Sequence, residues 1–244
     1  MVSRRRHRAS VRQLTPEESG RRWDDFTLRH TNSGDWAAWL GDSWSFHLPL
    51  LARMMEIAPR GGRILEVGAG GGPSLLWLAA RGYECVGIDY RAEVVAAARR
   101  NADRLGLDIR VEVGDAFDLS DHGGFDVVFS LGMIEHWERH ESVRALQEQA
   151  RAGRHVIAVI PTLNTRFTAT ITDERFYSPR ELRAMFEEAG LTDIRSFAYG
   201  IAPTRSARIS SLALPHAAFR LMQNTTGWTA MGQAAIGLSQ SSAR

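Results

Sequence analysis

The sequence predicts an α/β domain in which helices cover both faces of a mostly parallel β-sheet. Two observations lead to this fold class. Short apolar segments without strict alternation recur along the chain, as expected for strands that are buried on both faces. Segments with helical spacing, several of them ended by glycine, separate these strands. At 244 residues and 44% hydrophobic, the chain can bury one sizeable core.

The regular alternation of strands and helices begins at residue 63. Helices are expected at 73–81, where Gly82 closes the helix, and at 92–105, where Gly106 stops an alanine-rich stretch. Strands are expected at 63–67, 85–89, 109–113, 125–130 and 155–160. This order of elements is typical of a parallel sheet.

The C-terminal part of the chain extends the same pattern. A helix with a capping box opens at Ser178 and closes at Gly190. Residues 205–224 have helical spacing that Pro215 interrupts. Two further strands, which bring the sheet to seven, are expected at 194–199 and 233–239.

The N-terminal part differs from the rest in composition. Residues 1–20 are polar and charged, which is typical of an unordered tail. Residues 21–60 are rich in aromatic side chains, and the apolar spacing predicts a helix over 46–57. The resulting division is a basic tail at 1–20, a helical cap or lid at 21–60, a core at 61–204, a helical insertion at 205–230, and a last strand with the C-terminus at 231–244.

The charge of the chain is concentrated in its first residues. Five arginines precede the first acidic residue, Glu17; they are Arg4, Arg5, Arg6, Arg8 and Arg12. Removing these five charges from the net charge of +2 leaves −3 for residues 13–244. A mildly acidic body argues against a broad nucleic-acid-binding face.

The cysteine content and the hydropathy indicate where the protein works. Cys85 is the single cysteine, so no disulfide can form within the chain, which suits a reducing cytoplasm. No apolar stretch approaches the ~18–20 residues needed to cross a bilayer. We therefore expect a cytoplasmic monomer or homodimer without a membrane partner.

A glycine-rich segment, Glu-Val-Gly-Ala-Gly-Gly-Gly at 66–72, lies between the first strand and the first helix. Glycine lets the backbone turn tightly and approach a ligand, and the next helix offers free N–H groups. A dinucleotide fingerprint would need glycine where Pro73 stands. A P-loop would need a lysine, and the chain has none.

This segment resembles motif I of the class I S-adenosylmethionine (SAM)-dependent methyltransferases. The resemblance continues in order over about residues 60–200, through Asp89, the segment Gly114-Asp115-Ala116, and the segments 125–128, 131–136 and 176–182. The chain is similar to the methyltransferase type 11 and ubiquinone-biosynthesis methyltransferase group. The resemblance implies a Rossmann-like fold with a seven-stranded sheet, SAM as cofactor and S-adenosylhomocysteine as product.

The resemblance also implies which residues bind SAM. Asp89 would bind both ribose hydroxyls, because each carboxylate oxygen can accept a hydrogen bond, and Asp115 would meet the adenine amino group. The alternative readings are a helix N-cap for Asp89 and a turn residue for Asp115. The expected cofactor-binding residues are Glu66, Gly68, Ala69, Gly70, Gly72, Asp89, Tyr90, Asp115, Ala116, Ser130 and Leu131.

Candidates for a general base lie at the same end of the sheet. They are His136, Glu135, Tyr177 and His47. His136 is the first choice, because it follows the fourth strand, where the family places groups that face the acceptor; alternatively it orients Glu135 or caps a helix. Some relatives bind a divalent metal through Glu-x-x-Glu-His. Gly132 replaces the first glutamate here, so even with His140 nearby no metal is expected.

Two segments are candidates for the wall around the methyl acceptor. Trp36, Trp39 and Trp44 would line a lid that excludes water, or pack the cap onto the sheet. Within 205–230, the residues that suit an apolar pocket, and that helix packing explains equally, are Pro215, His216, Phe219 and Met222.

The sequence as a whole predicts an enzyme that methylates an oxygen or nitrogen atom of a small molecule or short peptide. The family resemblance suggests a specialised metabolite and natural product biosynthesis. Two alternatives stay open: an RNA or protein methyltransferase that docks through the arginine-rich tail, and a non-catalytic SAM-binding partner subunit. A nicotinamide dehydrogenase is a further hypothesis. Comparing the binding of NAD with that of S-adenosylhomocysteine would test it.

Overall fold

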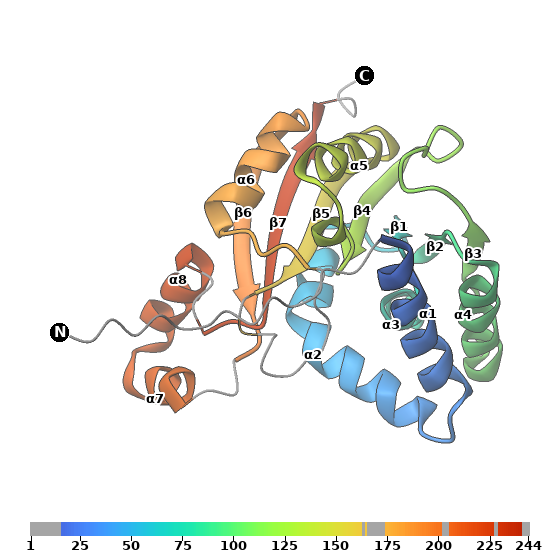
Figure 1. The fold of residues 1–244 in the computed structure, drawn as a ribbon, viewed down its shortest axis with the longest axis horizontal. Helices are drawn as coiled ribbons and strands as arrows, with labels where there is room; N and C mark the ends of the chain where they lie inside the picture. The colour runs from blue at the N-terminus through green and yellow to red at the C-terminus, as the bar shows by residue number, and fades with distance from the viewer. Residues whose placement is uncertain (1–15, 163, 165–173, 202–204, 227–228, 241–244) are drawn as a thin grey trace.

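The computed structural model describes residues 16–162, 164, 174–201, 205–226 and 229–240, and contains one seven-stranded sheet (Figure 1). The strand order is β3-β2-β1-β4-β5-β7-β6. β7 is antiparallel to both of its neighbours, and the remaining pairs are parallel. The strands are β1 (Arg63–Val67), β2 (Glu84–Asp89), β3 (Arg110–Val113), β4 (Phe125–Leu131), β5 (Gly153–Pro161), β6 (Leu191–Tyr199) and β7 (Gly232–Ser239). The predicted Rossmann-like architecture is confirmed.

Helices cover the two faces of this sheet and its carboxyl end (Figure 1). They are α1 (Pro16–Asn32), α2 (Trp36–Ile57), α3 (Pro73–Ala79), α4 (Ala92–Leu105), α5 (Arg139–Ala152), α6 (Pro179–Glu188), α7 (Arg205–Ala213) and α8 (His216–Thr226), with a 3₁₀ turn, η1, at Ile134–His136. Among the helices that the structure describes, none is both long enough and apolar enough to traverse a bilayer.

The central strands are apolar on both faces because each face has its own core. Val127 and Phe129 of β4 are buried in the cluster that α2, α3 and α4 cover. Val156 and Ile160 of β5 belong to a second cluster, which α5 and α6 cover. Each such side chain contributes about 1.5–3 kcal/mol of burial free energy, so the two-sided core fixes the register of the strands.

The N-terminal helices are longer than the sequence predicts. α1 begins at Pro16, inside the segment 1–20 that we expected to be unordered, and residues 1–15 lie outside the described residues. α2 begins at Trp36 rather than at residue 46. Leu40, only 2% exposed, anchors this additional part of α2 in an apolar cluster with Leu76. Packing therefore extends the helix beyond the stretch where the sequence is visibly periodic.

Candidate active site

A cavity of about 690 Å³ opens at the carboxyl ends of the parallel strands. The loops that follow β1, β2, β3 and β4 form one part of its wall, and the ends of β5 and β6 form another. α1 and α2 complete the wall (Figure 1). The strand order reverses between β1 and β4, and ligands of open α/β sheets bind at such a switch point.

The glycine-rich turn after β1 packs closely against neighbouring side chains. Gly68 and Gly70 have φ of +77° and +53°, a conformation that favours glycine. A Cβ on Gly71 would lie 2.8 Å from Cη2 of Trp39. Gly72 is the N-cap of α3 and does not line the cavity, so its role is to start the helix. Gly68, Ala69 and Gly70 do line it.

Asp89, at the end of β2, lies against this turn. Its Oδ2 accepts a hydrogen bond from the Gly70 N–H at 2.9 Å, and its Oδ1 accepts one from the Arg91 N–H at 3.3 Å. Arg91 is the N-cap of α4, so the N-cap reading of Asp89 is wrong. Burial raises the pKa of Asp89. The carboxylate is placed to receive donors from a ligand in the cavity.

Glu66 is a second buried carboxyl group in the cavity wall. Its side chain is 2% exposed, and within the described residues its Oε2 has no hydrogen-bond partner. Burial, together with the nearby charge of Asp89, raises the pKa of Glu66 well above its ordinary value. A buried acceptor of this kind is costly unless a ligand supplies its donors, so Glu66 is suited to bind a polar or cationic group.

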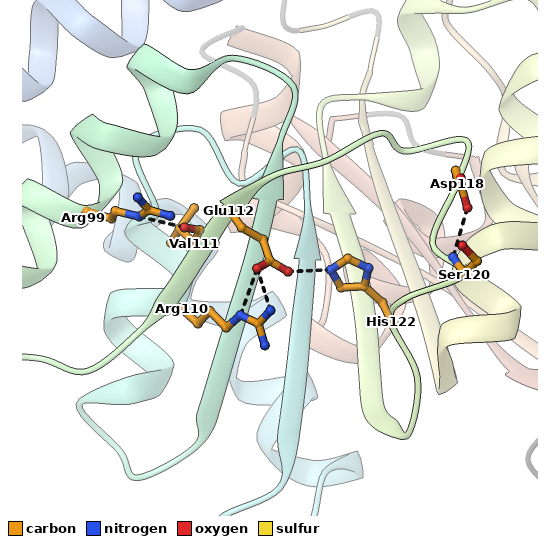
Figure 2. A network of polar contacts seen from close by, with 7 residues as sticks. All are labelled: Arg99, Arg110, Val111, Glu112, Asp118, Ser120 and His122. Atoms are coloured by element: carbon orange, nitrogen blue, oxygen red, sulfur yellow. Dashed lines mark hydrogen bonds and ion pairs between the residues drawn. The ribbon is translucent and has the colours of Figure 1, made fainter.

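The loop after β3 brings Asp115 and Ala116 to the cavity. Asp115 Oδ1 accepts a hydrogen bond from the Phe117 N–H at 2.8 Å, so the turn reading is correct and does not exclude a ligand contact. Figure 2 shows how Glu112 of β3 fixes the other end of this loop. Its carboxylate accepts from Arg110 Nη2 at 2.7 Å and contacts His122 Nε2 at 2.9 Å. Glu112 and His122, which hold the loop in place, do not line the cavity.

The segment after β4 brings Leu131, Glu135 and His136 to the cavity. His136 Nε2 lies 3.9 Å from Glu135 Oε1, and the imidazole packs edge-on against Trp23, with 6.0 Å between ring centroids. Arg175 donates from Nη1 to the His136 carbonyl oxygen at 3.0 Å, which fixes η1.

Gly132, the position at which the sequence resemblance led us to expect no metal ligand, has a φ of +61°. The described residues contain no group of three or more histidine, cysteine or acidic side chains that could hold a metal ion. The absence of a metal stays a prediction.

Besides Gly72, two predicted site residues lie outside the cavity wall. Ser130 is buried within the fold, where Gln149 Nε2 donates to its Oγ at 3.3 Å. Tyr177 packs against the apolar cluster that contains Leu182 and Met185. Ser178 caps α6 and thereby holds the preceding tyrosine against that cluster.

His47 reaches the cavity from α2, next to Tyr199 at the end of β6. Its Nδ1 lies 2.9 Å from the Tyr199 hydroxyl oxygen. Burial lowers the pKa of His47 to about 4. Tyr199 could not be predicted as a site residue, because its partner lies 152 residues away in the chain.

Helix α1, most of which lies in the segment 21–60 predicted to form a cap or lid, contributes wall residues that were not predicted individually. Trp23, Asp24, Phe26 and Thr27 line the cavity. Asp24 Oδ2 lies 3.1 Å from Arg91 Nη1 and accepts from the Tyr90 hydroxyl at 3.3 Å. Tyr90 itself lines the cavity, as predicted for a cofactor-binding residue. The pair ties α1 to the turn that carries Asp89.

Of the two segments predicted to surround the methyl acceptor, only some residues line the cavity. Trp39 lines the cavity, whereas Trp44 donates from Nε1 to the Pro73 carbonyl oxygen at 2.7 Å, and Trp36 lies under the Arg104 guanidinium at 5.0 Å. From the C-terminal insertion, the four residues that suited a pocket do not line it; they are Pro215, His216, Phe219 and Met222. Met231, just beyond them, does.

The strand order, the glycine-rich turn and the cavity define a class I methyltransferase fold, and a family model described as a methyltransferase domain matches residues 64–155. Over this segment the chain is similar to class I SAM-dependent methyltransferases.

Particular relatives include ubiquinone biosynthesis O-methyltransferases. That of Paramagnetospirillum magneticum is 37% identical over 146 residues, which cover 53% of this chain and 59% of the relative. That of Aeromonas salmonicida is 31% identical over 152 residues, covering 54% and 63%. The chain thus spans less than two thirds of these relatives' lengths.

Solved structures share the fold. A SAM-dependent methyltransferase from Thermotoga maritima aligns with a TM-score of 0.61 at 16% identity, covering 89% of this chain and 99% of that one. Magnesium protoporphyrin IX methyltransferase from Synechocystis with bound SAM gives a TM-score of 0.60 at 15% identity, covering 94% and 99%.

Proposed function

We propose that this protein is a SAM-dependent methyltransferase that transfers a methyl group to an oxygen or nitrogen atom of a small molecule or short peptide. The observation that carries the proposal is the continuous cavity that joins the glycine-rich turn and Asp89 to His136 and the aromatic side chains of α1 and α2. One cavity can therefore hold a cofactor beside an acceptor. Its volume of about 690 Å³ falls within the ~300–1,000 Å³ range of small-molecule sites.

The cofactor fits the donors and acceptors of the wall. Asp89 would accept from the ribose hydroxyls, Asp115 would meet the adenine, and the buried Glu66 would receive donors that it lacks among the described residues. Gly68 and Gly70, which carry no Cβ and adopt positive φ, would let a ligand approach the backbone closely. When bound, the sulfonium of SAM supplies an electrophilic methyl group.

The residues of the chain would then orient the acceptor, exclude water and take up a proton. Holding the reacting atoms in line supplies much of the acceleration of a displacement reaction. His136 is the preferred proton acceptor, because it lines the cavity beside Glu135, which can stabilise the imidazolium. Trp23, Phe26 and Trp39 cover the cavity and would exclude water.

A small acceptor is favoured over a polymer because side chains of α1 and α2 line the cavity together with the ends of the strands. The finer assignment, a specialised metabolite modified in the cytoplasm, is part of the same proposal and rests on the family resemblance and the single buried Cys85.

The experiment that tests the proposal combines binding with labelling. Calorimetry would first show that S-adenosylhomocysteine binds and that NAD does not. Methyl-labelled SAM and host extract would then be incubated with the protein, and small metabolites, peptides, proteins and RNA separated. We expect label in the small-metabolite or peptide fraction.

Label in RNA or protein, with steep salt dependence and loss of activity on deletion of residues 1–12, would instead support docking through the arginine tail. Binding of S-adenosylhomocysteine without label in any fraction would favour a non-catalytic partner subunit.

A further inference from the structure

The cavity contains a polar pair, His47 and Tyr199, within an apolar stretch of its wall. His47 belongs to α2 and Tyr199 ends β6. Their neighbours are the ring of Phe46, with its centroid 5.4 Å from that of Tyr199, and Met231, which also lines the cavity. None of the cofactor-binding residues named above takes part in this pair.

Tyr199 is held rigidly by the sheet. Its side chain is fully buried, and a Cβ added to Gly232 would lie 2.8 Å from Tyr199 Cζ, so the ring lies flat on the backbone of β7. Phe197 stacks on it, with ring centroids 6.1 Å apart. The hydroxyl oxygen therefore has a fixed position, 2.9 Å from Nδ1 of His47.

In this hydrogen bond the donor is either the Tyr199 hydroxyl or a protonated Nδ1 of His47. Within the described residues, His47 Nδ1 is the hydrogen-bond partner of the Tyr199 hydroxyl. If Nδ1 carried the proton, the buried O–H of Tyr199 would be left without an acceptor there, which is unfavourable. If Tyr199 donates instead, both groups are satisfied. The imidazole proton of a neutral His47 then lies on Nε2.

We propose that Tyr199 is a positioning residue that holds His47 in the Nε2–H tautomer, so that His47 presents a hydrogen-bond donor to an oxygen atom of the methyl acceptor. Rather than a base, His47 is then a specificity residue. A low pKa agrees with this role, because a neutral imidazole whose Nε2 already carries a proton cannot take up another near pH 7. The proposed function enters this inference only in naming the occupant of the cavity.

The position of this donor indicates that the acceptor carries a hydrogen-bond-accepting oxygen. An N–H donor on His47, beside the ring of Phe46 and near Met231, favours a molecule that is largely apolar and carries an accepting oxygen, such as a carbonyl, at that point. A molecule that lacks this oxygen would leave the Nε2–H group of His47 without a partner, which lowers its affinity.

The tautomer can be measured in the free protein, without SAM. Nitrogen-15 chemical shifts distinguish a ring nitrogen that carries hydrogen from one that does not. We expect a protonated Nε2 and a bare Nδ1 for His47, with His47→Gln used to assign the signals. His155 is an internal control that should show the opposite tautomer. Its Nδ1 lies 3.1 Å from the Asp126 carbonyl oxygen, which can only accept, so Nδ1 should carry the proton. Tyr199→Phe should move the His47 signals toward a mixture and leave those of His155 unchanged.

Recognition can be measured with two probes, acetophenone and ethylbenzene, which differ in the carbonyl oxygen. We expect the wild-type protein, saturated with S-adenosylhomocysteine, to bind acetophenone roughly 3- to 10-fold more tightly than ethylbenzene, the scale of one hydrogen bond. His47→Leu should remove this preference while keeping the ethylbenzene affinity within about two-fold. A His47 signal with protonated Nδ1, or an equal preference in the variant, would overturn the inference. Failure of S-adenosylhomocysteine to bind would contradict the proposed function but leave the tautomer result intact.

Discussion

Asp89 illustrates how one side chain can serve both the fold and a ligand. Its carboxylate closes the glycine-rich turn through the Gly70 N–H and remains in the cavity wall. A ribose would compete with or add to this contact. The proposed ligand role would therefore use the same two oxygens as the local role.

Replacing Asp89 with alanine should weaken S-adenosylhomocysteine binding by about 1–3 kcal/mol, the scale for losing hydrogen bonds to a charged group. Calorimetry would measure the change. Asp118→Ala is the matched control. Asp118 lies in the loop between β3 and β4 and accepts from the Ser120 N–H (Figure 2). It does not line the cavity. An unchanged affinity in Asp89→Ala would remove Asp89 from the site.

Glu66 makes the stability of the free protein depend on pH. Its pKa is above the ordinary value, so the folded protein binds this proton more tightly than the unfolded chain does. The resulting stabilisation is complete below about pH 4.5, the ordinary pKa of a glutamate, and is lost as the pH rises through the raised pKa.

Glu66→Gln should therefore raise Tm at pH 8 and leave it nearly unchanged at pH 4.5. The expected scale is roughly 2–4 °C per kcal/mol for a chain of this size. Thermal melts at the two pH values would measure this, with the exposed Glu56→Gln as control. An equal effect at both pH values would argue against burial of the charge as the cause.

His136→Ala should lower turnover by roughly 10²–10⁴-fold, the usual contribution of a general base. Binding of S-adenosylhomocysteine should stay within about two-fold. His122→Ala, which changes a histidine that contacts Glu112 rather than the cavity, is the control. Unaltered turnover would mean that positioning alone suffices or that another group takes the proton.

At the scale of elements, α1 is held over the cavity by a small set of polar contacts. Asp24 pairs with Arg91, and Arg104 of α4 donates to the Thr31 carbonyl oxygen at 2.7 Å. Few apolar residues of α1 are fully buried. The attachment of this helix therefore depends strongly on Asp24.

Asp24→Asn should increase amide hydrogen exchange within α1 by roughly 5–30-fold, which corresponds to a loss of about 1–2 kcal/mol of local stability. Exchange in β4 should not change. Asp25→Asn, one residue later and exposed, is the matched control. Equal protection in the two variants would show that packing, not the ion pair, holds α1.

The sequence predicted the elements whose ends carry strong local signals. The helix at 92–105 has the predicted bounds, because Gly106 adopts φ of +63° at its C-cap. α5 was not predicted, since its sequence is largely charged and its buried face, apart from Leu146, consists of small or polar residues such as Ala145 and Gln149. The glycine-rich turn and Asp89 were found for the same reason as the helix: their chemistry is local. Trp23, Asp24 and Tyr199 reach the cavity only through tertiary packing, which one sequence does not reveal.

The residues that line the cavity come from segments distributed between α1 and the start of β7. A ligand that binds this surface is bound only by the folded chain, so it should stabilise the entire fold. At 100 times its Kd, S-adenosylhomocysteine should add about 2.7 kcal/mol, or roughly 5–11 °C in Tm. Differential scanning calorimetry with and without the ligand would measure the shift, with NAD as control. No shift at saturation would mean that the ligand does not bind the native state.

β7 has a practical consequence for work with this protein. Because β7 runs antiparallel to β5, its first residue, Gly232, pairs with Pro161 in the cavity wall, while Leu238 pairs with His155 at the opposite end of the sheet. The chain thus leaves the sheet on the side away from the cavity (Figure 1). A fusion partner or surface tether attached after Ser239 would leave the entrance clear for soluble molecules. An attachment before Pro16 would load the helix that covers that entrance.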